Sequence, residues 1–251
     1  MPEFCCICNI PVHAVFVPVL LWASISFCLL KIVILHMEIR NIIFDFDGTL
    51  MDTAPVIIAT MEATIREMGL PPRSPQQCRA TIGLRLEDVP ATLFPDHPGI
   101  SAGFAATYRR IFFRENRPGV AKPFPGVIDT LRTLHAGGYP MAVASSRSHK
   151  SLQEFADTFA LTGLFSMLVG GDDVVRAKPA PDPVFFICRK MGWNPTETLV
   201  VGDATYDILM GRNAGSPTCA VTYGNQSRSQ LLSVSPDFII DRFSAIRDIL
   251  P

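Results

Sequence analysis

The sequence predicts an α/β fold, in which a doubly wound, Rossmann-like parallel sheet carries an inserted small α-helical cap domain. Residues 42–46 form a short, mostly apolar run, which is typical of a strand in a parallel sheet buried on both faces. From residue 141 onward, similar apolar segments alternate with segments of helical spacing. About 90 residues separate the first strand from the next clear one at 141–145, although a crossover helix needs only about a dozen. A further unit is therefore expected inside this gap.

The segment inside the gap has the pattern of a small helical bundle. Its apolar residues recur at helical spacing, Gly69 is placed to end one helix, and Pro75 to begin another. The expected helices cover residues 54–68, 74–82, 86–93 and 101–116. We therefore predict a helical cap at residues 52–122 and a catalytic core at residues 37–51 and 123–251.

The rest of the core is expected to alternate between helices and strands. Ser148 and Asp182 are placed to cap helices at their first turns, and Gly192 and Gly215 to end them. The expected helices are 126–135, 148–159, 182–192 and 206–214, and the expected strands are 141–145, 167–170, 199–202, 219–224 and 238–240. This alternation is what a doubly wound parallel sheet requires.

The first 36 residues differ in composition from the rest of the chain. They contain two charged side chains, and residues 10–30 contain none, which is roughly enough to span a ~30 Å bilayer as a helix. Two interpretations stay open. One is a membrane anchor that keeps the body cytoplasmic, because Lys31 and Arg40 follow the run. The other is a dispensable extension or a start-site artefact, because Met37 is a natural beginning for a soluble domain.

Composition narrows the classes of function. The chain has 251 residues, which suffices for one large domain or for a core with a small second domain. Its net charge of -1 provides no electrostatic footprint for nucleic acid. Seven cysteines are present, and the three in the body form no CxxC pair, so neither a disulfide framework nor a zinc site is expected. A reduced, cytoplasmic compartment fits best.

Polar side chains follow four of the expected strands. In chain order they are Asp45 and Asp47, then Ser145 and Ser146, then Lys178, then Asp203 and Asp207. Because the carboxyl ends of parallel strands meet at one edge of a sheet, we expect these side chains to converge. Clustered carboxylates repel one another unless a hard cation binds them, and ligand sets of oxygen alone suit Mg²⁺. A lysine and hydroxyl groups beside a magnesium site suit a phosphoryl group.

A chemical role can be assigned to each side chain of this set. Asp45 is the candidate nucleophile, which would attack phosphorus and form an aspartyl-phosphate. Asp47 is the candidate general acid for the leaving alkoxide and the base for water. Asp203 would ligate Mg²⁺, and Asp207 would ligate it or hold its water. Lys178 would offset the negative charge and bind the transferring group.

These motifs carry a resemblance to a known family. The DFDGT run at 45–49, the serine after a strand, the lysine before a proline and the GDxxxD run at 202–207 match, in order, the four motifs of the haloacid dehalogenase (HAD) superfamily. The resemblance covers residues 37–250. The helical insertion after the first motif is similar to that of the phosphoglycolate phosphatase and β-phosphoglucomutase branch. The runs GTLMDTAP, PFPGV, AKPAPDP and VTYG resemble phosphoglycolate-phosphatase-like members.

The resemblance implies roles for individual residues. Asp45 would be the nucleophile, and Asp47 the acid and base, with its backbone carbonyl on Mg²⁺. Ser145 and Lys178 would bind phosphate, Asp203 would be a metal ligand, and Asp207 would be a supporting acid. An aspartate at 47 argues against dehalogenase chemistry, because dehalogenating members lack this acid and use no metal.

Two arginines and one serine have more than one interpretation. Arg85, in IGLRLED, stands where relatives often have a small or apolar residue. It is either a charge on the surface of the cap or a guanidinium that binds the anionic end of the substrate. Arg147 is expected to be solvated rather than in contact with substrate. Ser146 is both a candidate substrate-binding residue and, with Ser148, a candidate helix cap, which leaves Ser145 free.

The sequence thus predicts a Mg²⁺-dependent phosphatase of a small phosphorylated metabolite, either phosphoglycolate-like or a sugar phosphate. The cap would close over the site, exclude water and supply specificity. Inorganic pyrophosphate hydrolysis and phosphomutase transfer on a hexose phosphate are alternatives, and an inactive membrane-tethered interaction protein is a third. No nucleic-acid partner is expected, membrane contact is expected only if the first 36 residues are an anchor, and either a monomer or a homodimer is compatible with the sequence.

Overall fold

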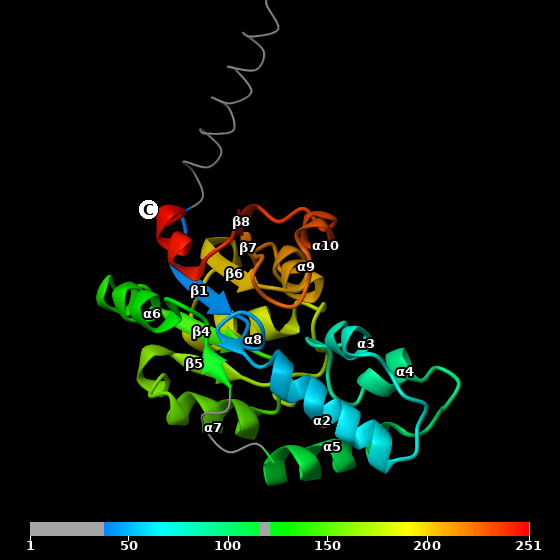
Figure 1. The fold of residues 1–251 in the computed structure, drawn as a ribbon. Helices are drawn as coiled ribbons and strands as arrows, with labels where there is room; N and C mark the ends of the chain where they lie inside the picture. The colour runs from blue at the N-terminus through cyan, green and yellow to red at the C-terminus, as the bar shows by residue number, and fades with distance from the viewer. Residues whose placement is uncertain (1–37, 116–120, 251) are drawn as a thin grey trace, which may run out of the picture. The chain divides into compact units, whose positions relative to one another are not determined.

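The computed structural model describes residues 38–115 and 121–250 and contains the predicted parallel sheet (Figure 1). Its strands lie in the order β5 (Met167–Val169), β4 (Met141–Ala144), β1 (Asn41–Phe44), β6 (Thr198–Gly202), β7 (Thr218–Val221) and β8 (Phe238–Ile240). Every neighbouring pair in this sheet is parallel. The chain adds two strands on one side of β1 and then three on the other, which is a doubly wound order. The predicted fold class is confirmed.

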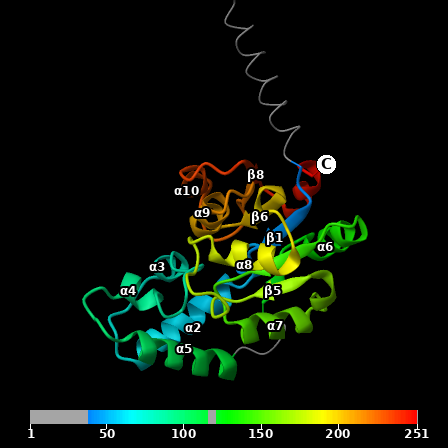
Figure 2. The same cartoon turned by 180° about the vertical axis from the view of Figure 1, so that it is seen from behind.

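Helices cover both faces of this sheet (Figures 1 and 2). Ile42 and Phe44 of β1 belong to the core on one face, and Ile43 belongs to the core on the other. The first face is covered by α6 (Val127–Ala136), α7 (His149–Thr158) and the 3-10 helix η3 (Phe243–Asp248), and the second by α8 (Asp182–Met191), α9 (Thr205–Asn213) and α10 (Arg228–Leu232). Burial on both faces is the reason that the strands are almost continuously apolar.

The long gap after β1 contains the predicted inserted helices. The described part of residues 52–122 has four: α2 (Ala54–Glu67), α3 (Pro75–Arg79), α4 (Val89–Leu93) and α5 (Ser101–Glu115). Figures 1 and 2 show them grouped beyond the carboxyl end of β1. A short antiparallel pair, β2 (Met51–Asp52) and β3 (Lys122–Pro123), was not predicted and lies at the base of the insertion. Because the residues from Ile39 onward form one compact unit, the division into core and cap stays a prediction.

Two of the inserted helices are shorter than predicted. Helix α3 ends at Arg79 instead of residue 82, and α4 begins at Val89 instead of residue 86. Between them Gly83 has a φ of 104°, and Ile82 forms a β-bridge with Leu84. A helix cannot continue through such a backbone, which favours glycine. Residues 80–88 therefore form a loop, called the 80–88 loop below.

Helix ends elsewhere follow the sequence with one correction. Ser148 caps α7, as predicted, because its side chain accepts a hydrogen bond from the backbone N–H of Ser151. Asp182 is the first residue of α8 and not its N-cap, which is Pro181. The carboxylate of Asp182 pairs instead with Arg176 at 3.0 Å. Helix α10 and the 3-10 helices, η1 (Thr162–Leu164) and η2 (Pro195–Glu197) as well as η3, were not predicted, because they are too short to show a clear period.

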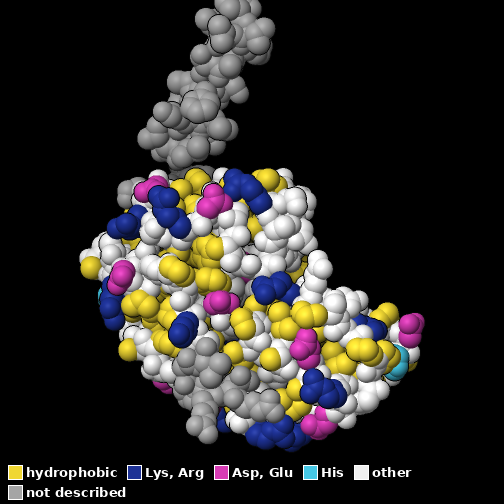
Figure 3. Space-filling view, in the orientation of Figure 1, with side chains coloured by type: hydrophobic (Ala, Val, Ile, Leu, Met, Phe, Trp, Pro, Cys, Tyr) yellow, Lys and Arg dark blue, Asp and Glu magenta, His cyan; other side chains and the backbone are white. Residues whose placement is uncertain are grey.

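Charged side chains of one sign do not cluster on the face shown in Figure 3, where basic and acidic side chains are interspersed. The net charge of -1 is consistent with this distribution. Among residues 38–115 and 121–250, no helix combines the length and the apolar character needed to cross a bilayer. The candidate membrane anchor at residues 1–36 lies outside the described residues.

Candidate active site

Three predicted carboxylates meet at the carboxyl edge of the sheet. Asp45 follows β1 and Asp203 follows β6, and these two strands are neighbours. Asp207 lies in the first turn of α9 (Thr205–Asn213), the helix that follows Asp203. One carboxylate oxygen from each of the three residues lies within 4.8 Å of the others, and all three side chains are buried. The site therefore lies where the strand order reverses, which is where ligands bind in open α/β sheets.

Lys178 supplies the positive charge at the centre of this cluster. Its Nζ donates to Asp45 Oδ1 at 2.5 Å and to Asp207 Oδ1 at 2.6 Å. The Lys178 side chain is only 2% exposed. A buried ammonium group is tolerated only where charges and hydrogen bonds compensate for its lost hydration. Lys178 and the two aspartates therefore form one unit.

One lysine does not balance three buried carboxylates. Burial, together with the charges of Asp207 and Asp203, raises the pKa of Asp45 well above its ordinary value, although Lys178 opposes this rise. Burial and the charge of Asp207 raise the pKa of Asp203 to about 7. Burial alone would lower the pKa of Lys178, but its two carboxylate partners outweigh burial and raise it. The cluster thus retains an excess of negative charge that a proton or a cation can neutralise.

Asp203 is held by neighbours that the sequence analysis did not single out. Thr49 Oγ1 donates to Asp203 Oδ1 at 3.2 Å, and the backbone N–H of Asn225 donates to Asp203 Oδ2 at 2.6 Å. Asn225 Nδ2 also reaches the backbone carbonyl of Asp47 at 3.4 Å. Asn225 follows β7, so its position after an apolar strand was the available signal. The donor groups orient the Asp203 carboxylate towards the shared space of the cluster.

Asp207 has both of its oxygens engaged. Oδ1 accepts from Lys178, and Oδ2 accepts from the backbone N–H of Ala204 at 3.0 Å. The second bond satisfies a backbone donor at the start of α9, as a first-turn acid commonly does. Asp207 therefore orients Lys178, and its predicted role as a metal ligand stays a prediction.

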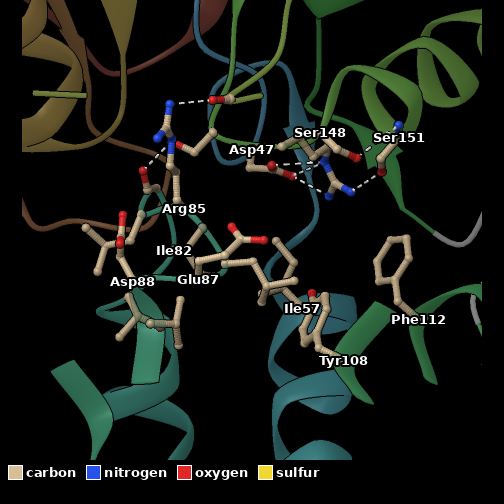
Figure 4. Close-up of a pocket in the computed structure, with 18 of the residues that line it drawn as sticks. Asp47, Ile57, Ile82, Arg85, Glu87, Asp88, Tyr108, Phe112, Ser148 and Ser151 are labelled. Carbon is tan, nitrogen blue, oxygen red and sulfur yellow. Dashed lines mark hydrogen bonds and ion pairs between the residues drawn. The ribbon is translucent and has the colours of Figure 1, made fainter. Parts of the chain in front are cut away.

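Asp47 lies apart from this cluster and pairs with Arg147. Arg147 Nη2 donates to Asp47 Oδ1 at 2.7 Å, and Nε donates to Oδ2 at 3.0 Å. Arg147 Nη1 donates to Ser151 Oγ at 3.0 Å. Dashed lines in Figure 4 join Asp47 and Ser151 to this guanidinium. The expectation of a solvated Arg147 was wrong, because its side chain is only 10% exposed.

Aromatic rings surround the Arg147 guanidinium. Its Cζ lies 4.6 Å from the ring centre of Phe155, 5.4 Å from that of Phe112 and 5.9 Å from that of Phe46. Phe112 belongs to the inserted helix α5, Phe155 belongs to α7, and Phe46 follows β1. A guanidinium over aromatic faces is favoured electrostatically. Arg147 thus connects the core, the inserted helices and Asp47.

The two predicted serines have different surroundings. Ser145 is buried, and its Oγ accepts from the backbone N–H of Arg147 at 3.2 Å. Ser146 Oγ donates to the backbone carbonyl of Gly83 at 2.6 Å, so it contacts the 80–88 loop and does not cap α7. Substrate binding by either serine stays a prediction.

Arg85 contacts main-chain carbonyls of the core. Its Nη2 donates to Gly171 O at 2.5 Å and to Val174 O at 2.6 Å, and its Nη1 donates to Val175 O at 3.2 Å. Its Nε is buried and has no hydrogen-bond partner among the described residues. Arg85 therefore attaches the 80–88 loop to the segment that precedes Lys178. Its predicted contact with substrate stays a prediction.

A cavity of about 380 Å³ opens beside the carboxylates, between the core and the inserted helices (Figure 4). This volume lies in the range of small-molecule sites. Asp45 and Asp47 line its inner end together with Ser146 and Arg147. Most of the remaining lining comes from α2, the 80–88 loop and α5, and the start of α4, the start of α7 and the segment after β5 complete it.

The fold and the acidic centre together define a doubly wound α/β protein with a buried cluster of carboxylates at the carboxyl edge of its parallel sheet. The sequence profile of the haloacid dehalogenase-like hydrolases matches residues 42–221, and the chain belongs to this family. The predicted family membership and enzyme class are therefore confirmed.

Similar proteins cover nearly the whole body of the chain. A phosphoglycolate phosphatase from Aquifex aeolicus is 32% identical over 206 residues, which cover 81% of this chain and 92% of that protein. The pyrophosphatase PpaX from Halalkalibacterium halodurans is 29% identical and covers 85% of this chain and 98% of its own. The crystal structure of a predicted phosphoglycolate phosphatase from Haemophilus somnus superposes with a TM-score of 0.77 at 27% identity, covering 85% of this chain and 99% of that one.

The close packing around Gly48 generates a prediction about stability. Gly48 has a φ of 92°, and a Cβ there would overlap the side chains of Asp203 and Asn225. Gly69 has a φ of 63° with nothing near a Cβ, so Gly69→Ala should cost only the backbone strain of about 1–2 kcal/mol. Gly48→Ala should cost clearly more. Urea unfolding of both variants checks this, and equal losses would contradict the packing argument.

Proposed function

We propose that this protein is a Mg²⁺-dependent phosphatase of small phosphorylated metabolites and that it acts through an aspartyl-phosphate on Asp45. The observation that carries the proposal is the buried cluster of Asp45, Asp203, Asp207 and Lys178, of which Asp45 lines the cavity. Three buried carboxylates with an excess of negative charge form an oxygen-only donor set, which suits a hard divalent cation. Bound Mg²⁺ would neutralise charge on the phosphoryl oxygens.

Asp45 and Asp47 divide the chemistry of the proposed reaction. Asp45 attacks phosphorus, the bond from phosphorus to the ester oxygen breaks, and Asp47 transfers a proton to the departing alkoxide. Asp47 then takes a proton from water, and the water oxygen attacks phosphorus. The bond from phosphorus to Asp45 breaks, which releases phosphate and restores the Asp45 carboxylate. Lys178, already bonded to Asp45, holds the nucleophile in position and offsets the charge that gathers on the transferring group.

The inserted helices are proposed to act as a cap at residues 52–122. Phe112 of α5 packs against Arg147, and Ser146 and Arg85 join the core to the 80–88 loop. These contacts close the cavity over Asp45 and Asp47 and would limit the access of water during phosphoryl transfer.

The proposed substrate class is a small phosphate monoester, with phosphoglycolate-like esters and sugar phosphates as the candidates that the sequence predicts. A relative named phosphoglycolate phosphatase supports this class. Pyrophosphate is a second candidate substrate, because the relative PpaX, which is named a pyrophosphatase, is 29% identical over 214 residues. Both reactions would use the same nucleophile and the same acidic cluster.

Asp45→Asn should abolish turnover of p-nitrophenyl phosphate, with a loss of at least about 10³-fold, because an amide cannot act as the nucleophile. Asp52→Asn is a matched control, since Asp52 is an exposed aspartate on β2. Circular dichroism should show that both variants are folded. Substantial residual turnover by folded Asp45→Asn would reject the aspartyl-phosphate mechanism.

Mg²⁺ should stabilise the protein more at pH 8 than at pH 5.5. The pKa of Asp203 is raised from an ordinary 3.8 to about 7. Between pH 3.8 and pH 7, the metal-free folded protein therefore binds more protons than the unfolded chain. Protonation of Asp203 therefore stabilises the metal-free folded protein in acid, and this stabilisation is lost as the pH rises through 7. Mg²⁺ must displace that proton at pH 5.5 but not at pH 8.

Thermal unfolding with EDTA or with excess Mg²⁺ at the two pH values checks this expectation. At a concentration of 100 times its Kd, Mg²⁺ should raise the free energy of unfolding by about 2.7 kcal/mol. EDTA should also stop turnover, and added Mg²⁺ should restore it. An equal or larger Mg²⁺ effect at pH 5.5 would contradict the assignment of Asp203 as a ligand.

Arg147→Lys should lower kcat roughly 10- to 100-fold and leave KM nearly unchanged, because a lysine keeps the charge but cannot hold both oxygens of Asp47. Arg109→Lys, at an exposed arginine of the cavity lining, is the control. A rise in KM alone would indicate that Arg147 binds substrate, and an unchanged kcat would show that the pairing with Asp47 does not matter for turnover.

A further inference from the structure

The wall of the cavity beyond Asp45 and Asp47 has a large apolar part. Helix α2 contributes Ile57 and Met61, the 80–88 loop contributes Ile82 and Leu84, and α5 contributes Tyr108 and Phe112. Figure 4 shows Ile57 and Tyr108 on the side of the cavity opposite Asp47. The leaving alcohol of a phosphate ester held at Asp45 would extend towards this wall. Apolar surface of the alcohol would be buried there and contribute to binding.

Each arginine of the cavity lining is already engaged within the protein. Arg147 donates to both oxygens of Asp47, and Arg85 donates to three main-chain carbonyls. Arg109 forms an ion pair with Glu87. Arg147 and Arg109 are paired with carboxylates, and both terminal nitrogens of Arg85 are bonded to main-chain carbonyls, so a second anionic group on a substrate would compete with these partners for the described arginines of the lining.

Carboxylates of the protein also line this cavity. Glu87 and Asp88 line it, and Figure 4 shows Glu87 extending towards its middle. Burial would raise the pKa of Glu87, but the hydrogen bond from Arg109, a backbone hydrogen bond and the charges of Arg109 and Arg85 together outweigh burial and lower it, so Glu87 is anionic at neutral pH. A substrate carboxylate or second phosphate would therefore meet like charge.

We propose that the substrate is a phosphate monoester whose alcohol presents an apolar face of about the size of one ring and carries no second anionic group. This inference rests on the proposed phosphatase function and names the substrate class of the same site. It selects against phosphoglycolate and pyrophosphate, which both carry a second anion, and favours esters that fill the space between α2 and α5.

The test compares substrates of matched reactivity on the full chain with Mg²⁺. Benzyl phosphate and 4-carboxybenzyl phosphate have the same reacting oxygen and ring and differ in one remote carboxylate. We expect kcat/KM for benzyl phosphate to exceed that for 4-carboxybenzyl phosphate, phosphoglycolate and pyrophosphate by at least about tenfold. The inference is overturned if phosphoglycolate, pyrophosphate or 4-carboxybenzyl phosphate is turned over with a kcat/KM as high as that of benzyl phosphate.

Two pairs of variants connect this preference to the cavity. Leu84→Ala should raise KM for benzyl phosphate about tenfold, whereas Leu70→Ala, at a similarly half-buried leucine outside the cavity, should not. Asp88→Asn should reduce the difference in kcat/KM between benzyl phosphate and 4-carboxybenzyl phosphate. Asp96→Asn, at an exposed aspartate of the insertion outside the cavity, should leave this difference unchanged. No difference within either pair would count against the inference.

The outcome also separates this inference from the function on which it rests. Absence of turnover for every phosphate ester, p-nitrophenyl phosphate included, would reject the phosphatase function itself. Turnover of p-nitrophenyl phosphate together with a preference for an anionic ester would reject only the substrate class.

Discussion

The buried ion pairs of Lys178 with Asp45 and Asp207 are the interaction on which the rest of the site depends. Without the ammonium group, the carboxylates that follow β1 and β6 would be buried side by side with no compensating charge from the protein. With it, the cluster still holds more negative than positive charge, as the raised pKa of Asp203 indicates. Such a cluster is stable enough to form and remains able to bind a cation.

The doubly wound strand order explains why these groups meet. β1 lies between β4 and β6, so the segments that follow the three strands share one edge of the sheet. The order reverses at β1, and the crossovers on its two sides leave space there for a ligand. The insertion after β1 covers that space with α2, the 80–88 loop and α5. One topological feature thus positions both the chemistry and the substrate wall.

Two arginines show how the insertion and the core are joined. Arg147 comes from the core and contacts Phe112 of α5, whereas Arg85 comes from the insertion and donates to core carbonyls. Both were singled out in the sequence, and Arg147 does not have the solvated surroundings that were expected for it. Arg147 was expected in solvent because arginine usually lies there, but aromatic rings from three segments enclose it. No local pattern reports such a convergence.

The sequence by itself determined the α/β class, the position of the insertion and the set of carboxylates at the strand ends, because apolar periodicity and strand-end motifs are local properties of the chain. It could not determine which oxygens bind Lys178, that Asn225 and Thr49 hold Asp203, or that Asp47 pairs with Arg147. These contacts join residues about 100 or more positions apart in most cases and depend on three-dimensional packing. The charge and apolar surface of the cavity were decided in the same way, by how α2, α5 and the 80–88 loop fold back over the sheet.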